Sequence, residues 1–243
     1  PGNPDVAVAS PITAENGVDP NQPAKLLEVP SPPVMVSLLD MWKQQRKDAR
    51  VLIVLDVSGS MQEPTDPADP GGFTKLELAK TAAVESLGEF KSSDEVGLRI
   101  FSTDLGPAGD QEFLDLLDIQ AMSTNREALA NSIRGLTPTN GTPLYSVTSS
   151  AYQEMVDSHD PSRINAIVLL TDGTNDDGDQ SDDQSQLQQL LTQLRDNTNG
   201  ENDKPIPIFP IGYGSGANRD VLTQIAEASN AAYYSASDPE TII

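Results

Sequence analysis

Three oxygen-bearing side chains follow one apolar run early in the chain. The aliphatic residues 51–55 lead directly into Asp56, Ser58 and Ser60. In an extended segment, side chains two residues apart point the same way, so the three oxygens could converge on one point. One carboxylate with two hydroxyls suits a hard cation such as Mg²⁺, which takes oxygen ligands and keeps several waters. An ordinary strand-to-loop turn built from Ser and Gly is the alternative interpretation.

A second carboxylate follows a second apolar run. Residues 167–170 are Ile-Val-Leu-Leu, and Asp172 comes two positions later, between Thr171 and a glycine. Asp56 and Asp172 are therefore each expected at the carboxyl end of a buried strand, where open parallel α/β sheets bind their ligands. If the two strands are neighbours, both carboxylates reach the same crevice. Thr142, at a junction between a loop and a helix, could then supply a third hydroxyl.

These side chains have to be positioned by strands and helices that alternate along the chain. Apolar runs bounded by turn residues predict strands at residues 51–55, 96–101, 113–117, 164–170, 206–211 and 232–235, of which 113–117 is expected at an edge. Amphipathic patterns predict helices over residues 74–89, 125–134, 185–197 and 219–228, and another that opens at Pro143. This alternation predicts an α/β fold, with a doubly wound, mainly parallel sheet and helices on both faces.

Composition predicts three parts in the chain. Residues 1–33 are rich in Pro, Ala, Asn and Asp, which predicts a linker or the tail of a preceding domain. Residues 34–49 predict an amphipathic lead-in helix. Residues 50–243 contain the alternating strands and helices of one domain. We expect its last helix, which begins near Ser237, to be truncated at the end of this sequence.

The charge balance limits the classes of partner. The chain has 37 acidic and 15 basic residues, a formal net charge of −22, which disfavours nucleic acid and anionic membrane surfaces as partners. There is no cysteine, so disulfides and a thiol nucleophile are excluded. No apolar run reaches the length of about 18 residues that predicts a membrane-spanning helix. This acidic composition and the Pro-rich start favour an extracellular or cell-surface location, as a fragment of a larger secreted or anchored protein.

Three separated motifs occur in a characteristic order. They are Asp-x-Ser-x-Ser at residues 56–60, Gly-Thr-Pro at residues 141–143 and Thr-Asp-Gly at residues 171–173. Together they resemble the von Willebrand factor type A domain and its metal-ion-dependent adhesion site, over roughly residues 50–243. The local motifs are most similar to those of secreted bacterial members, in particular actinobacterial ones.

The resemblance implies a set of metal ligands and a function. Ser58, Ser60 and Thr142 are implied to bind a divalent cation directly or nearly directly, and Asp56 and Asp172 directly or through water. The implied cation is Mg²⁺ or Mn²⁺, with Ca²⁺ as a further candidate. The implied function is adhesion or protein binding, in which the cation bridges to a carboxylate that a protein partner presents.

Enzymatic functions fit these residues poorly. A phosphatase with an aspartyl nucleophile needs a second acid where this chain has Ser58, and a serine hydrolase needs a histidine base. The only histidine, His159, is predicted at the surface near a helix end, and Gly212-x-Gly214-x-Gly216 is interpreted as a tight turn. We therefore expect a protein that is not an enzyme. Besides adhesion, two non-enzymatic roles stay open: an intracellular-type assembly module that partners a ring ATPase, and a structural module with an empty site.

An acidic loop follows the second strand motif. Its aspartates are Asp176, Asp177, Asp179, Asp182 and Asp183. We expect Asp66 and Asp69, in the loop after Ser60, to face them. A solvated loop that aids solubility is one interpretation, and a second cation such as Ca²⁺ is another, although no EF-hand pattern is present. The third is a docking surface for basic residues of the partner, because these acids would otherwise repel its carboxylate.

Overall fold

The structure of the chain is a computed structural model. It describes residues 31–66, 68–198, 204–214 and 218–236. The chain divides into two units, residues 1–46 and residues 47–243. In the first unit the described element is helix α1 (Pro32–Gln45), which lies where the lead-in helix is predicted. Nearly all of the predicted linker at residues 1–33, and the predicted last helix from Ser237, lie outside the described residues.

The second unit is built on a six-stranded sheet with the strand order β3-β2-β1-β4-β5-β6. Its strands are β1 (Ala49–Asp56), β2 (Glu95–Leu105), β3 (Gln111–Ala121), β4 (Ile164–Thr171), β5 (Ile208–Gly212) and β6 (Tyr234–Ser235). All neighbouring pairs are parallel except β2 and β3, which are antiparallel. The predicted mainly parallel sheet is therefore confirmed, and the segment predicted around residues 113–117 is the antiparallel edge strand β3.

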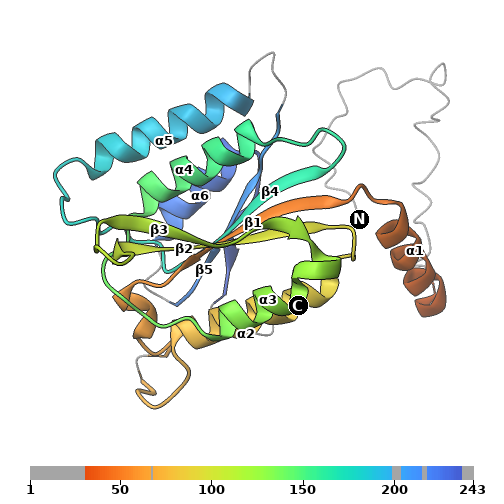
Figure 1. Cartoon of the computed structure of the whole chain (residues 1–243), viewed down its shortest axis with the longest axis horizontal. Helices are drawn as coiled ribbons and strands as arrows, with labels where there is room; N and C mark the ends of the chain where they lie inside the picture. The colour runs from red at the N-terminus through yellow and green to blue at the C-terminus, as the bar shows by residue number, and fades with distance from the viewer. Residues whose placement is uncertain (1–30, 67, 199–203, 215–217, 237–243) are drawn as a thin grey trace, which may run out of the picture. The chain divides into compact units, whose positions relative to one another are not determined.

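Helices cover both faces of this sheet (Figure 1). The α-helices are α2 (Lys75–Ser86), α3 (Met122–Arg134), α4 (Leu144–Asp157), α5 (Asp183–Thr198) and α6 (Arg219–Ala228). Helices α2 and α3 pack on one face, and α4, α5 and α6 pack on the other. This arrangement confirms the doubly wound α/β fold. Within the described part of the chain, no helix has both the length and the apolar character needed to cross a membrane.

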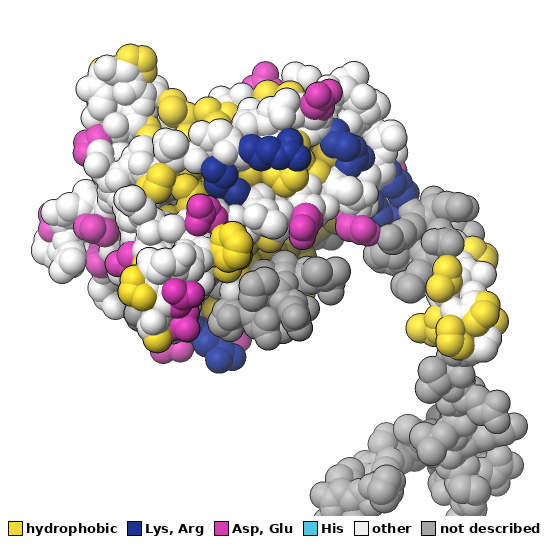
Figure 2. Space-filling model, turned by 90° about the horizontal axis from the view of Figure 1, so that it is seen from below, with side chains coloured by type: hydrophobic (Ala, Val, Ile, Leu, Met, Phe, Trp, Pro, Cys, Tyr) yellow, Lys and Arg dark blue, Asp and Glu magenta, His cyan; other side chains and the backbone are white. Residues whose placement is uncertain are grey.

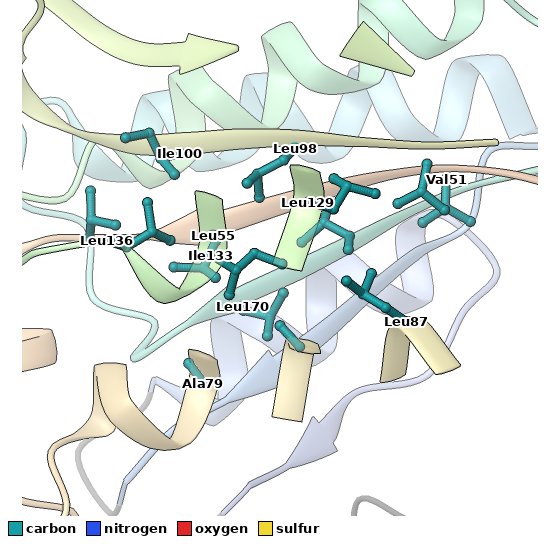
Figure 3. Packing of buried hydrophobic residues seen from close by; sticks show 14 of the residues in the cluster. Val51, Leu55, Ala79, Leu87, Leu98, Ile100, Leu129, Ile133, Leu136 and Leu170 are labelled. Atoms are coloured by element: carbon teal, nitrogen blue, oxygen red, sulfur yellow. The ribbon is translucent and has the colours of Figure 1, made fainter. Parts of the chain in front are cut away.

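The apolar residues of β1 divide between two cores. Because side chains alternate along a strand, Val51, Ile53 and Leu55 pack on the side of α2 and α3, while Leu52 and Val54 pack on the opposite side. All five are at most 5 % exposed. Figure 3 shows the first of these cores, in which side chains of α2 and α3 meet those of the sheet. A strand covered on both faces is apolar at every position, which explains the continuous run.

The strand order places β1 beside β4 near the middle of the sheet, where the direction of winding reverses. From β1 the chain passes through α2 to β2 on one side, and from β4 it passes through α5 to β5 on the other. In open α/β sheets this switch point leaves a crevice outside the carboxyl ends of the strands. Asp56 ends β1 and Asp172 follows β4, so both predicted carboxylates lie at the switch point.

Basic side chains gather on one face of this acidic protein. Figure 2 shows the face that α2 and α3 cover, with a row of Lys and Arg side chains across it. These helices carry Lys80, Arg126 and Arg134. The ammonium of Lys80 donates to the backbone carbonyl of Leu136, and the guanidinium of Arg126 donates to that of Phe90. A net charge of −22 therefore coexists with a basic strip over α2 and α3.

Candidate metal centre

Asp56 is buried at the end of β1, with none of its surface exposed. Its Oδ1 atom accepts a hydrogen bond from the backbone N–H of Ser58 at 2.8 Å. Its Oδ2 atom accepts one from the hydroxyl of Thr171 at 2.6 Å. Because Thr171 is the last residue of β4, these bonds connect the ends of neighbouring strands and hold the Asp56 carboxylate in one orientation.

The two predicted serine ligands lie next to each other. Ser58 is fully buried and Ser60 is half-buried, and their Oγ atoms are 3.0 Å apart, within hydrogen-bond distance. The sequence predicts an extended path through both serines, and this prediction is wrong beyond Ser58, because Gly59–Gln62 form a 3-10 helix. The backbone N–H of Met61 bonds back to the Ser58 carbonyl, so the turn itself brings the two hydroxyls together.

Thr142 is 4 % exposed, in a loop that is bonded to the two other segments of the site. The backbone N–H of Gly59 donates to the carbonyl of Asn140 at 2.6 Å, which joins this loop to the serine turn, residues 58–62. Thr142 and Asp176 exchange two backbone hydrogen bonds, of 2.6 and 2.8 Å, which join it to the acidic loop. Gly141 permits this approach, because a Cβ there would overlap the carbonyl oxygen of Asp176.

Asp172 lies close enough to Asp56 to affect its ionisation. Burial, and to a smaller extent the charge of Asp172, raise the pKa of Asp56 to about 6, although hydrogen bonds from Ser58 and Thr171 oppose the shift. Asp172 is itself 5 % exposed. It is followed by Gly173 with a φ of 79°, a left-handed conformation that favours glycine and turns the chain away from the sheet.

One charged side chain of this site is not predicted from the sequence. Lys75 is the first residue of α2 and is buried, and its ammonium lies 3.0 Å from Asp172 Oδ2 and 2.8 Å from Glu63 Oε2. Burial opposes its charge, but the interactions with Glu63 and Asp172 outweigh burial and raise the pKa of Lys75. The sequence shows only that Lys75 follows the helix cap Thr74, which does not indicate where its side chain points.

The donor set fits a hard divalent cation. The structure brings together two buried carboxylates, Asp56 and Asp172, with the hydroxyl pair of Ser58 and Ser60. All of these are oxygen donors, the type that Mg²⁺ and Mn²⁺ take. Two buried negative charges near each other are unfavourable without compensation. Lys75 compensates one of them, so the remaining charge and the donor chemistry both suit a divalent cation.

Three of the five aspartates of the acidic loop lie close together. Carboxylate oxygens of Asp177, Asp182 and Asp183 lie within 4.8 Å of one another. Neutral side chains already donate to them, Gln186 to Asp177 and Asp182 at 2.8 and 2.9 Å, and Asn175 to Asp183 at 2.7 Å. Such bonds satisfy carboxylates without a cation. The second cation and the docking surface for basic residues therefore both stay predictions.

The remaining residues singled out in the sequence are not among the proposed oxygen donors. His159, predicted at the surface, is half-buried and follows the C-terminal end of α4. Gly214 has a φ of 79°, as a tight turn requires, while Gly216 lies outside the described residues. Asp66 accepts a hydrogen bond from the backbone N–H of Ala68 within its own loop. Its predicted position facing the acidic loop stays a prediction.

Asp56 is expected to make the metal-free protein less stable as the pH rises. Because its pKa is about 6 in the folded state and about 3.9 when unfolded, the folded state holds the proton more tightly. That stabilisation is complete below about pH 4 and is lost as the pH rises through about 6. Asp56→Asn cannot ionise, so the wild type should lose about 2–3 kcal/mol relative to this variant between about pH 4 and pH 7.

Urea unfolding of both proteins in the presence of a chelator measures this difference. The comparison with Asp56→Asn removes the pH dependence that all the other carboxylates share. A stability difference that does not change with pH would contradict burial of an ionisable Asp56.

Solved structures of several proteins share this fold at low sequence identity. A von Willebrand factor type A protein from Catenulispora acidiphila matches with a TM-score of 0.60 and 19 % identity, over 81 % of this chain and 40 % of that one. The PilB minor pilin from Streptococcus sanguinis matches with a TM-score of 0.59 and 14 % identity, over 82 % of this chain and 59 % of that one. This chain therefore spans less than two thirds of the length of either relative.

A third structure extends the comparison beyond bacteria. The manganese-loaded TRAP protein from Plasmodium vivax matches with a TM-score of 0.54 and 15 % identity, over 81 % of this chain and 71 % of that one. A search of curated proteins finds no match.

The sequence match to a family model covers the whole candidate site. The model of the von Willebrand factor type A domain matches residues 51–243, which include the serine turn, the Thr142 loop and Asp172. The matched range is most of the chain, and its six-stranded sheet with helices on both faces is the fold of the structural relatives. The chain therefore belongs to the von Willebrand factor type A domain family.

Proposed function

We propose that this chain is a cation-dependent protein-binding module, in which Mg²⁺ or Mn²⁺ is held by Asp56, Ser58, Ser60, Thr142 and Asp172. The observation that carries the proposal is the convergence of two buried carboxylates and a hydroxyl pair at the switch point of the sheet. The bound ion supplies an open coordination position, at which a carboxylate oxygen of a protein partner replaces water.

The residues of the site have different roles in this proposal. Asp56 and Asp172 supply the negative charge that holds the cation, while the serine and threonine hydroxyls are neutral ligands that orient it. Lys75 already neutralises part of the charge of Asp172. The cation therefore keeps residual positive charge, and a partner carboxylate is attracted to it through a short, charge-assisted contact.

The charge of the chain favours a partner that presents basic residues around its acidic one. With a net charge of −22 and an acidic loop after Asp172, the protein repels a partner whose surface is acidic only. We propose an adhesive role at a cell surface or outside the cell. A minor pilin and a pilus adhesin, SpaC from Lactobacillus rhamnosus GG, are structural relatives that supply a precedent for this role.

Titration of the whole chain with Mn²⁺ tests the proposal. Bound Mn²⁺ with an open position carries exchangeable water, which enhances proton relaxation of the solvent. We expect one strong Mn²⁺ site, and acetate, a minimal carboxylate, should displace that water and reduce the enhancement. Absence of Mn²⁺ binding would overturn the proposal. A relaxation enhancement that acetate does not reduce would contradict carboxylate bridging. An assembly role beside a ring ATPase, the second candidate, needs no acetate response.

Thr142→Ala should weaken the response to acetate more than the affinity for Mn²⁺. The lost hydroxyl is neutral, so we expect the Mn²⁺ dissociation constant to rise by about fivefold or less, the equivalent of one hydrogen bond. The geometry of the open position should be disturbed more strongly. Thr142→Ser keeps the hydroxyl and is the matched control. Equal losses of Mn²⁺ affinity and acetate response would count against this role of Thr142.

A further inference from the structure

Lys75 occupies an enclosed position for a residue at a helix start. Its side chain is 8 % exposed, although a lysine normally extends its ammonium into water. The ammonium contacts Asp172 Oδ2 at 3.0 Å and Glu63 Oε2 at 2.8 Å. The stem passes Gly214, where a Cβ would come within 3.0 Å of Lys75 Cε. Three segments therefore enclose this cation: the chain before α2, the end of β4 and the turn after β5.

The two buried aspartates of the site have different partners. The hydrogen bonds described for Asp56 come from neutral groups, the backbone N–H of Ser58 and the hydroxyl of Thr171. Asp172 is bonded to an ammonium instead. One positive charge thus already lies at the candidate metal centre, on a carboxylate that a divalent cation is expected to use. Two cations that share one carboxylate repel each other, and burial strengthens this repulsion.

We propose that Lys75 is an internal cation that competes with the divalent cation for Asp172 and so sets the affinity of the site. Without a divalent cation, the ammonium satisfies the buried carboxylate. With one bound, the ammonium opposes it. Glu63 is 65 % exposed on its side chain and moderates this effect by neutralising part of the Lys75 charge. The inference rests on the proposed function, because it requires a divalent cation at Asp172.

This competition has a consequence for partner binding. A divalent cation that binds weakly because of Lys75 gains a further negative ligand when a partner carboxylate arrives. Binding of the cation and of a carboxylate should therefore be cooperative, and by linkage each should raise the affinity of the other by the same factor.

Lys75→Met is the first variant of the test, because methionine keeps most of the apolar stem and removes the charge. We expect calorimetry to show Mn²⁺ binding at least tenfold tighter than in the wild type. Lys80→Met is the matched control. It removes the same charge from the same helix, but the Lys80 ammonium bonds the carbonyl of Leu136 instead of a site carboxylate. The control should leave Mn²⁺ affinity within about twofold of the wild type, because the half-buried Lys80 ammonium is bonded to a backbone carbonyl and not to a carboxylate of the site.

Glu63→Gln should change the Mn²⁺ affinity in the opposite direction, and it leaves Lys75 in place. With its charge no longer moderated, Lys75 should compete more strongly, and Mn²⁺ affinity should fall several-fold. In the double variant with Lys75→Met, the Glu63→Gln change should have no effect, because Glu63 acts through Lys75. A loss that persists in the double variant would mean that Glu63 binds the cation itself, which overturns the inference. Because Glu63 is largely exposed, the single Glu63→Gln variant can be measured even if Lys75→Met folds poorly, and an unchanged Mn²⁺ affinity in it would contradict the inference.

Thermal unfolding separates competition from a purely structural role. In a chelator, Lys75→Met should unfold at a lower temperature than the wild type, because Asp172 loses its partner. Saturating Mn²⁺ should raise its Tm by more than it raises that of the wild type, as tighter binding requires. Equal Tm losses with and without Mn²⁺, together with unchanged affinity, would overturn the role of Lys75 and leave the proposed function intact. Absence of Mn²⁺ binding in both proteins would overturn both.

Discussion

Mn²⁺ affinity should fall by about 100-fold or more when Asp172 or Asp56 is replaced by alanine. Mutation of a residue that only hydrogen-bonds a metal ligand already lowers metal affinity by about 10–100-fold, and loss of a charged ligand should lower it at least as much. Both carboxylates are buried at the switch point of the sheet, and they supply the negative charge of the proposed site. The neutral hydroxyls of Ser58 and Ser60 do not replace that charge. Calorimetric titration of each variant with Mn²⁺ measures the loss.

Asp179→Ala is the control for this pair of variants. Asp179 is an exposed aspartate of the same rim whose carboxylate bonds within its own turn, to the backbone N–H and hydroxyl of Ser181. Asp179→Ala changes the net charge by the same amount as the other two variants and should leave Mn²⁺ affinity nearly unchanged. Circular dichroism should show a retained fold in all three variants. Unchanged Mn²⁺ affinity in both Asp56→Ala and Asp172→Ala would remove these residues from the proposed metal site.

Arg99→Met should lower the free energy of unfolding by about 2–3 kcal/mol, which is below the roughly 3–5 kcal/mol that breaking a fully buried ion pair costs. Arg99 is 2 % exposed in the middle of β2. Its guanidinium binds both carboxylate oxygens of Asp115 on β3, at 2.6 and 2.9 Å, contacts Glu154 on α4, and lies 3.9 Å from the ring centre of Phe113.

The cost is expected to be smaller because the two acids are not buried with Arg99. The side chains of Asp115 and Glu154 are 41 % and 43 % exposed, so water can solvate them once the guanidinium is gone. Arg163→Met is a suitable control, because Arg163 is 20 % exposed, its ion pairs with Glu95 and Asp160 are both 3.3 Å long, and its bond to the Ser93 carbonyl is at the surface. It should cost less than about 1 kcal/mol. Urea unfolding compares the two, and equal losses would contradict a special role for Arg99.

Arg99 also connects the fold to the proposed site. It joins β2 and β3 to α4, and α4 begins at Leu144, two residues after Thr142. Loss of this connection should therefore disturb the Thr142 loop before it disturbs Asp56, which is held by β1 and β4. A modest fall in acetate response, with Mn²⁺ affinity retained, is the expected functional effect of Arg99→Met.

Most of the fold was predictable because its signals are local. The run at residues 51–55 reads as a strand buried on both faces, and the structure packs its alternate side chains into two cores. Helix α6 has the predicted bounds, residues 219–228, and Thr74 and Glu77, which are close in the sequence, form a capping box at the start of α2. The antiparallel direction of β3 was not predictable in this way, because strand direction depends on the partner strand and leaves no period in the sequence.

The part of the candidate site that depends only on which strands are neighbours was predictable. Two apolar strands that each end in an aspartate imply neighbouring carboxylates only if the strands pair, and β1 and β4 do pair. The path of the serines was predicted wrongly, because a 3-10 turn and an extended segment both suit a Ser-Gly-Ser sequence, and packing decides between them. The two hydroxyls nevertheless lie close together as predicted, since the turn brings the Oγ atoms of Ser58 and Ser60 to 3.0 Å from each other.

The sequence by itself determined the strands, the helices and the oxygen donors that end two of the strands, because period, apolar runs and capping residues act between near neighbours in the chain. Only the tertiary structure decided which charges meet. Lys75 and Asp172 are 97 positions apart, and Arg99 and Glu154 are 55 positions apart. A long, flexible cationic side chain has no directional signal in the sequence. Its partner is whichever carboxylate the packing of distant elements places within its reach.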